Sequence, residues 1–119
     1  MVYDVENIFA KILRNEVSCV KVYEDDHALA FNDINPQAPI HVLVIPKGAY
    51  VSMDDFTASA SDMEIVAFFR AVGNTARQIG LSTAGYRVLA NTGDDGMQEV
   101  QHLHVHILGG KKMGPMVSI

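Results

Sequence analysis

Three histidines alternate with apolar residues near the C-terminal end of the chain, in the run His102–Ile107 (HLHVHI). Alternation with a period of two is typical of a half-buried β-strand. Successive side chains of a strand point to opposite faces, so one face carries the three imidazoles and the other enters the core. We therefore predict a strand over residues 99–108 that presents a row of histidines.

A row of histidines permits three interpretations: a metal site, a catalytic site for an anionic substrate, or polar surface. Histidines two residues apart lie roughly 6.8 Å apart on a strand, so three from one strand fit a single zinc ion poorly. His41, Asp94 or Asp95 could supply a further ligand, whereas Cys19, the only cysteine, is far away in the sequence. We favour catalysis without a metal and expect no cofactor.

Length and charge limit the classes of protein to which the chain can belong. A chain of 119 residues has the size of one domain, and we predict a single domain over residues 1–119. The net charge of −5, with scattered basic residues, argues against general binding to nucleic acid or anionic membranes. No apolar run reaches the ~20 residues of a membrane helix, and one cysteine excludes an internal disulfide. We expect a cytoplasmic protein without a signal peptide.

The remaining patterns predict helices and further strands. Asn7 is a candidate N-cap for a short helix. Ser61 and Glu64 fit a capping box, apolar residues then recur at helical spacing, and Gly80 ends this second helix. Strands are expected over residues 20–24, 27–33, 41–45 and 86–91, in addition to the histidine strand. Without strand–helix alternation, this order predicts an α+β fold with a five-stranded antiparallel sheet and two helices. The apolar tail over residues 113–119 is expected to pack on another surface, such as a second subunit.

The histidine face suits chemistry at phosphorus. A neutral imidazole is a nucleophile at neutral pH without a separate base, and neighbouring imidazoles can bind phosphate oxygens or protonate a leaving group. His104 has an imidazole on each side and is the natural nucleophile. The backbone amides of Gly96 and Gln98 could add anion donors. Asp94 and Asp95 would repel phosphate, so we expect them to point outward.

The pattern His-φ-His-φ-His-φ-φ over residues 102–108, where φ is apolar, resembles the motif of the histidine triad (HIT) nucleotide hydrolases and transferases. Residues 8–13, 24–26, 31–39, 41–47 and 106–110 are similar to the Hint branch of this family, and the Gly-Pro-Met ending resembles its bacterial members. The resemblance implies a homodimer whose two five-stranded sheets join into one. It also implies a metal-free purine nucleoside phosphoramidase or nucleotidyl hydrolase. A dinucleoside polyphosphate hydrolase, a nucleotidyl transferase and a nucleotide-binding scaffold remain alternatives.

The resemblance also implies residue roles. His104 matches the nucleophile that becomes nucleotidylated, and His106 matches a donor to the α-phosphate. His102 matches the residue that orients His104, and His41 a fourth histidine of the same network. Asp33 matches the carboxylate that binds the ribose hydroxyls. Further substrate-binding residues match an apolar slot for the purine (Phe9, Ile12, Phe31, Ile34 and Leu43) and polar contacts to ribose and phosphate (Asn91 and Gln98). Gly96, Met97 and Glu99, beside Gln98, are also expected to bind substrate.

Several of these residues have plainer interpretations without the resemblance. Phe9, Ile12 and Leu43 would be core residues, Asp33 an Asx-turn residue, and His41 a structural histidine.

One position departs from the pattern of animal Hint proteins. Glu99 stands where they carry a serine tied to the phosphoramidate leaving group. A carboxyl group there could act as an acid only if its pKa were raised.

Overall fold

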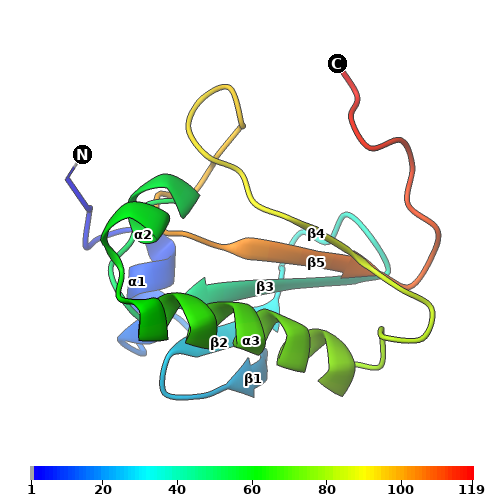
Figure 1. The fold of residues 1–119 in the computed structure, drawn as a ribbon, viewed down its shortest axis with the longest axis horizontal. Coiled ribbons are helices and arrows are strands. Elements are labelled where there is room, and N and C mark those ends of the chain that lie inside the picture. The colour runs from blue at the N-terminus through cyan, green and yellow to red at the C-terminus, as the bar shows by residue number, and fades with distance from the viewer. Residues whose placement is uncertain (1) are drawn as a thin grey trace.

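Five strands form one antiparallel sheet in the order β1-β2-β3-β5-β4 (Figure 1). The computed structural model describes residues 2–119 and bounds the strands as follows: β1 Lys21–Glu24, β2 Ala28–Asn32, β3 Ile40–Pro46, β4 Arg87–Leu89 and β5 Val105–Gly109. The central strand β3 is buried almost throughout, because its apolar sequence has packed layers on both faces. The predicted five-stranded antiparallel sheet is confirmed. Over the described residues, no helix has the length and apolar character needed to cross a membrane.

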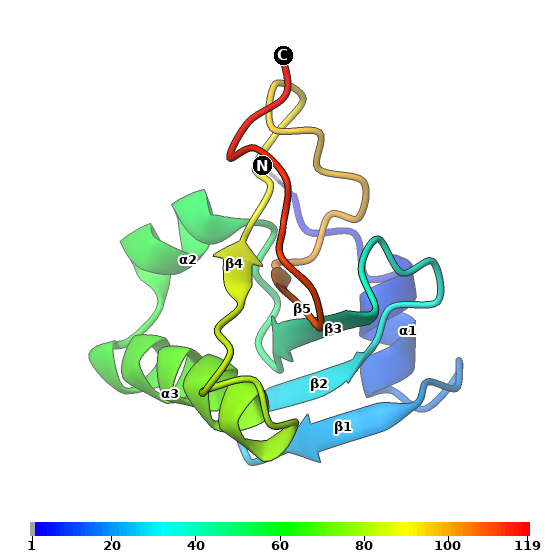
Figure 2. The same cartoon turned by 90° about the vertical axis from the view of Figure 1, so that its right-hand side faces the viewer.

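Three helices cover the two faces of the sheet: α1 Ile8–Leu13, α2 Met53–Ser59 and α3 Asp62–Gln78. Figure 2 shows α1 on one face and both α2 and α3 on the other. The prediction of two helices missed α2, which has seven residues and buries only Phe56. So short a helix with one buried side chain leaves no apolar periodicity in the sequence.

The long helix α3 begins and ends where its sequence signals predict. The amide of Glu64 donates to the Ser61 hydroxyl at 3.1 Å, and the amide of Ser61 donates to the Glu64 carboxylate at 3.2 Å. These bonds are the predicted capping box. After the last turn, Gly80 adopts a φ of 79°, a left-handed conformation that glycine tolerates without strain.

Two apolar cores lie on opposite faces of the sheet. The larger core packs α3 against the sheet and includes Val42 and Val44, and the smaller core packs α1 against the other face and includes Leu43 and Ile45. Alternate residues of β3 therefore enter different cores, which explains why its sequence is apolar throughout from Val42 to Ile45.

The predicted histidine strand over residues 99–108 is wrong in its first half, because β5 begins only at Val105. Pairing with β3 and β4 does not extend before that point. The amide of Leu103 instead donates to the carbonyl of Tyr50 at 2.8 Å. The alternation persists without the ladder, because Leu103, Val105 and Ile107 all enter the larger core.

Candidate active site

Two adjoining cavities share His104 and His106. The first, called here the polar cavity, has a volume of about 360 Å³ and is lined by Asp33, Asn35, Gln37, His41, Asn91, Met97, Glu99, His104 and His106. The second, called the apolar cavity, has a volume of about 330 Å³ and is lined by Ile8, Phe9, Ile12, Val17, Ser18, Cys19, Phe31, Asn32, Asp33, Ile34, Asn35, Leu43, Glu99, Val100, His104 and His106. The paired imidazoles therefore stand where a polar and an apolar site meet.

His104 presents an unprotonated nitrogen to these cavities. Its Nδ1 lies 2.8 Å from the carbonyl oxygen of His102, an acceptor only, so Nδ1 carries the proton and donates. Burial lowers the pKa of His104 below its usual value, and the ring is neutral at pH 7. Nε2 consequently holds the lone pair. The ring of Phe9 contacts His104 edge-on, with centroids 5.0 Å apart, and holds its orientation.

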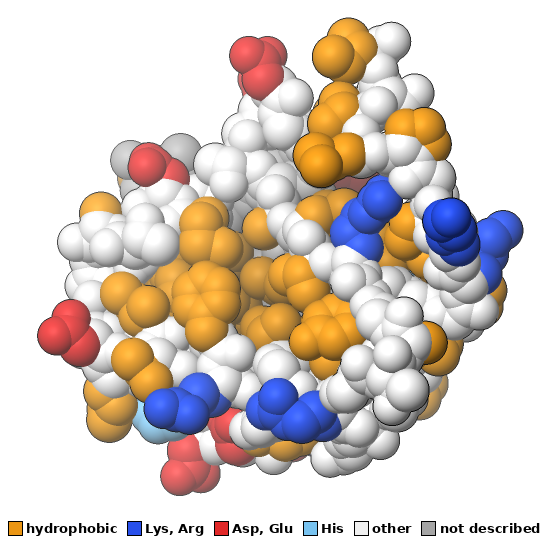
Figure 3. Space-filling model, turned by 45° about the vertical axis from the view of Figure 1, so that its right-hand side comes forward, with side chains coloured by type: hydrophobic (Ala, Val, Ile, Leu, Met, Phe, Trp, Pro, Cys, Tyr) orange, Lys and Arg blue, Asp and Glu red, His pale blue; other side chains and the backbone are white. Residues whose placement is uncertain are grey.

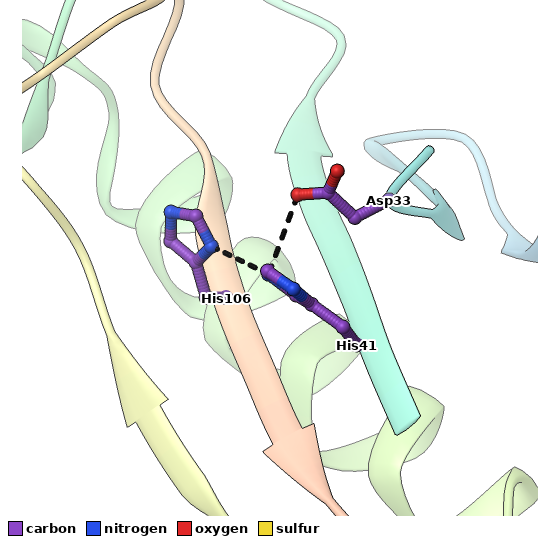
Figure 4. A group of neighbouring side chains, drawn as sticks. All are labelled: Asp33, His41 and His106. Carbon is purple, nitrogen blue, oxygen red and sulfur yellow. Dashed lines mark hydrogen bonds and ion pairs between the residues drawn. The ribbon is translucent and has the colours of Figure 1, made fainter. Parts of the chain in front are cut away.

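His106 has the opposite tautomer, because a chain of hydrogen bonds fixes it. The amide of Gln37 donates to His41 Nδ1 at 3.0 Å, so His41 carries its proton on Nε2. That nitrogen lies 2.9 Å from His106 Nδ1 and 3.3 Å from an oxygen of Asp33 (Figure 4). His106 therefore accepts at Nδ1 and carries its own proton on Nε2.

The Nε2 atom of His106 is buried and has no hydrogen-bond partner. Burial, reinforced by the neighbouring His104 and His41, lowers the pKa of His106 to about 4, so the ring is neutral at pH 7. A buried donor without an acceptor is unfavourable. The site thus offers one free donor on His106 beside one free lone pair on His104, with ring centroids 5.1 Å apart.

His102 lies behind the site and lines neither cavity. Its side chain is fully buried, with Nε2 donating to the carbonyl of Pro46 at 2.9 Å and Nδ1 accepting from the Tyr3 hydroxyl at 2.5 Å. Burial lowers the pKa of His102 to about 4. The group that contacts His104 is the backbone carbonyl of His102, not its ring. Sequence reasoning missed Tyr3, since no pattern connects it to a histidine 99 positions later.

Asp33 forms the Asx turn of its plainer interpretation, and its binding of ribose hydroxyls stays a prediction. One carboxylate oxygen accepts from the amide of Asn35 at 2.9 Å, which is an Asx turn. The other oxygen faces His41 and the polar cavity. The irregular segment that follows β2 also supplies Asn35 and Gln37 to the cavity wall, and both were missed as site residues. The prolines of this segment signalled irregular structure but not the direction of these side chains.

Asp33, His41 and His106 place candidate metal-ligand atoms within 4.8 Å of one another. Two ligand atoms of a tetrahedral zinc ion lie roughly 3.3 Å apart, from bond lengths of about 2.0–2.1 Å. The facing nitrogens of His41 and His106 are only 2.9 Å apart and share a proton. Hydrogen bonding accounts for this cluster, and its atoms would have to separate to hold zinc.

The five residues predicted for the purine slot all line the apolar cavity. Phe9, Ile12, Phe31 and Leu43 also belong to the smaller core, so the core and the cavity lining share these side chains. Ile34 differs, because it is 96% exposed and stands at the rim. The resemblance thus selected residues that line one cavity, whereas apolarity alone would have assigned most of them to the core. Their contact with a purine stays a prediction.

The loop before the histidines contributes only some of its predicted residues. Asn91, Met97 and Glu99 line the polar cavity, whereas Gly96 and Gln98 line neither cavity. The side-chain amide of Gln98 donates to two backbone carbonyls at 2.6 and 3.0 Å, and its oxygen accepts from a loop amide at 3.1 Å. Gln98 therefore holds the loop together, and its contact with substrate stays a prediction. Asp94 and Asp95 are exposed and also line neither cavity.

The sheet order and the paired imidazoles define a small α+β protein of the histidine-triad type. The HIT domain model matches residues 14–113, and the chain belongs to the HIT family. It is 60% identical to an uncharacterized 13.2 kDa HIT-like protein of Azospirillum brasilense, over 98% of this chain and 95% of that one. It is 41% identical to the purine nucleoside phosphoramidase of Escherichia coli K12, over 95% and 94% of the two chains.

A solved structure agrees with this assignment. The histidine triad protein from Clostridium difficile is 44% identical and superposes with a TM-score of 0.86, covering 98% of this chain and 100% of that chain.

Proposed function

We propose that the protein hydrolyses purine nucleoside 5′-phosphoramidates or related nucleotidyl conjugates through a covalent nucleotidyl intermediate on His104. The observation that carries the proposal is the pair of opposite tautomers, with a lone pair on His104 beside a free donor on His106. An attacking nitrogen and a donor for a phosphate oxygen are what substitution at phosphorus requires. The similarity to the E. coli purine nucleoside phosphoramidase supports this choice.

The two cavities suggest how the substrate lies. The purine enters the apolar cavity, where Phe9, Phe31 and Leu43 provide apolar contact. The ribose hydroxyls donate to the Asp33 oxygen that faces His41, since a carboxylate oxygen can accept more than one hydrogen bond. The α-phosphate then lies between His104 and His106, and the leaving group extends into the polar cavity.

The reaction proceeds in two displacements. In the first, the lone pair of His104 Nε2 forms a bond to phosphorus while the phosphorus–nitrogen bond breaks, and the departing amine takes a proton from solvent. The Nε2 proton of His106 binds a non-bridging oxygen as charge develops there. In the second, water attacks phosphorus, the bond to His104 breaks, and the proton that water loses returns to solvent. The products are a nucleoside monophosphate and an amine.

Steady-state turnover of an adenosine 5′-phosphoramidate tests the proposal, with wild type, His104→Ala and the control His27→Ala compared in the presence of EDTA. His27 lies outside both cavities. We expect turnover by the wild type and the control and a loss of at least about a thousandfold in His104→Ala. Wild-type activity on dinucleoside polyphosphates alone would favour a polyphosphate hydrolase or transferase. Tight mononucleotide binding without any turnover would favour a scaffold.

We also propose a homodimer joined at the β4 edge of the sheet. The surface beside this edge carries exposed Val66 and Phe69 on α3 and Val88 on β4. Figure 3 shows hydrophobic side chains gathered on this side of the molecule, with basic side chains at the margin of the patch. The apolar tail residues Met116 and Val117 are exposed as well, so the chain itself leaves them uncovered.

We also propose a cytoplasmic location, since the free Cys19 suits a reducing compartment.

A further inference from the structure

We propose that Glu99 selects substrates by the charge of the leaving group, favouring cationic or neutral amines over anionic groups. The inference rests on the proposed function, because it concerns the group displaced by His104. It assigns to Glu99 a role in specificity rather than in proton transfer.

The charges around the two cavities carry this inference. Among the described lining residues, Asp33 and Glu99 are acidic, and no lysine or arginine accompanies them. The lining histidines are neutral at pH 7, because burial lowers the pKa of each of them. The site therefore offers the unpartnered Nε2 donor of His106 to a phosphate oxygen and has no basic side chain for a second anionic group.

Glu99 is the freer of the two carboxylates. Both oxygens of Asp33 are engaged, one by an amide and one by His41. Glu99 is exposed, lines both cavities and forms no ion pair with any side chain in the described part of the chain. Its charge is available to whatever enters the mouth of the site.

The geometry of displacement brings the leaving group near this charge. An in-line attack places the leaving group opposite the attacking nitrogen of His104. In the proposed binding mode, with the purine in the apolar cavity, the leaving group extends into the polar cavity, and Glu99 is one of the residues that line it. An ammonium group there is attracted by the carboxylate, whereas a carboxylate or further phosphates are repelled.

The test uses three adenosine 5′-phosphoramidates whose amines have equal length and end in an ammonium, an amide or a carboxylate. Values of kcat/KM are compared for wild type, Glu99→Gln and the control Asp94→Asn, an exposed carboxylate of the same loop that lines neither cavity. A partly exposed charge changes kcat/KM roughly threefold to tenfold per unit of leaving-group charge. We expect the wild type and the control to rank ammonium over amide over carboxylate. In Glu99→Gln, the ratio of ammonium to carboxylate should fall by about tenfold or more.

Each other result has a distinct meaning. An equal loss of kcat/KM on all three substrates in Glu99→Gln would assign Glu99 to proton transfer and overturn the inference. A ratio of ammonium to carboxylate substrate that stays at the wild-type value in this variant would also overturn it. In the wild type, the ratio should also shrink when salt is raised from about 0.05 to 0.5 M, since screening weakens the attraction. A ratio independent of salt would contradict the inference without relying on a variant. No turnover of any substrate by the wild type would overturn the proposed function itself, and the inference with it.

Discussion

Hydrogen bonds on the far side of each imidazole determine what His104 and His106 present to a substrate. His104 Nδ1 donates a hydrogen bond to the carbonyl of His102, and His106 Nδ1 accepts one from His41. The two rings are both neutral yet differ in function, one with a lone pair and one with a proton. The sequence predicted His104 as the nucleophile from its central position. It could not predict the tautomers, because that of His106 depends on the distant side chain of His41 and that of His104 depends on how its ring turns toward the carbonyl of His102.

Tyr3 is expected to act as a positioning residue. In Tyr3→Phe, the buried Nδ1 of His102 loses its donor, which should lower the free energy of unfolding by about 1 kcal/mol. Because the backbone of His102 holds His104, we expect kcat to fall severalfold with little change in KM. The matched control is Tyr23→Phe, which removes a hydroxyl bonded to Asp25, outside both cavities. Equal effects of the two variants on kcat would argue against a role for Tyr3 in the site.

Stability should fall in mild acid. A histidine in the unfolded chain has a pKa of about 6.5, whereas the folded value for His102 is about 4. Between these values the unfolded state binds more protons, so the free energy of unfolding decreases as the pH falls from about 6.5 to about 4. His102 alone should account for about 3 kcal/mol of this decrease. Urea unfolding at pH 7, 6, 5 and 4 measures it, and a flat profile would refute the buried, neutral state of His102.

At the scale of secondary-structure elements, capping residues and apolar periodicity predicted those helices and strands whose sequence signals lie within the segment itself. The capping box of Ser61 and the left-handed Gly80 bound α3 as expected. The segment before Val105 does not pair as a strand, because β4 ends at Leu89 and β3, which continues to Pro46, pairs with β5 only as far as Val105. Within this segment, the amide of Leu103 bonds to the carbonyl of Tyr50 instead. The alternation of its side chains nonetheless placed the histidines on the face opposite the larger core. A period of two in the sequence indicates which side chains are buried, whereas a hydrogen-bonded strand also requires a neighbouring strand with which to pair.

The loop before β5 depends on a close backbone approach at Gly96. A Cβ at this position would lie 2.5 Å from the carbonyl oxygen of Thr92, so Gly96→Ala must displace the loop that carries Met97 and Glu99. We expect kcat/KM for a phosphoramidate to fall at least tenfold, while the thermal unfolding midpoint changes by only a few degrees. Gly114→Ala is the control, because a Cβ there meets nothing within 4 Å. If both variants kept wild-type activity, the loop would not need its present conformation.

At the scale of the whole molecule, the sheet order brings together residues from distant parts of the chain. Asp33 follows β2, His41 lies in β3 and His106 in β5, and the neighbouring positions of these strands place the three side chains in contact. Periodicity in the sequence predicted the strands but not their order. The resemblance to the HIT family predicted that these residues share one site. The apolar residues of the sequence could not show that the smaller core opens into a cavity, because the same side chains belong to the core and line the cavity.

The proposed dimer can be tested at the same scale. Phe69→Asp places a charge in the exposed apolar surface of α3, and Val20→Asp places one on an exposed apolar residue just before β1, at the other edge of the sheet. We expect wild type and Val20→Asp to sediment as dimers and Phe69→Asp to shift toward the monomer, because a buried unpaired charge is costly. A monomeric wild type, or a Phe69→Asp dimer of undiminished affinity, would contradict an interface on this side.

The most direct test of the central claim is mass spectrometry of the protein quenched during turnover of an adenosine 5′-phosphoramidate. We expect a transient adenylyl group on the peptide that contains His104, formed at least as fast as steady-state turnover and absent from His104→Ala. Sustained hydrolysis by the wild type with no such adduct under conditions that preserve a phosphorus–nitrogen bond, or with the adduct on another residue, would contradict His104 as the nucleophile.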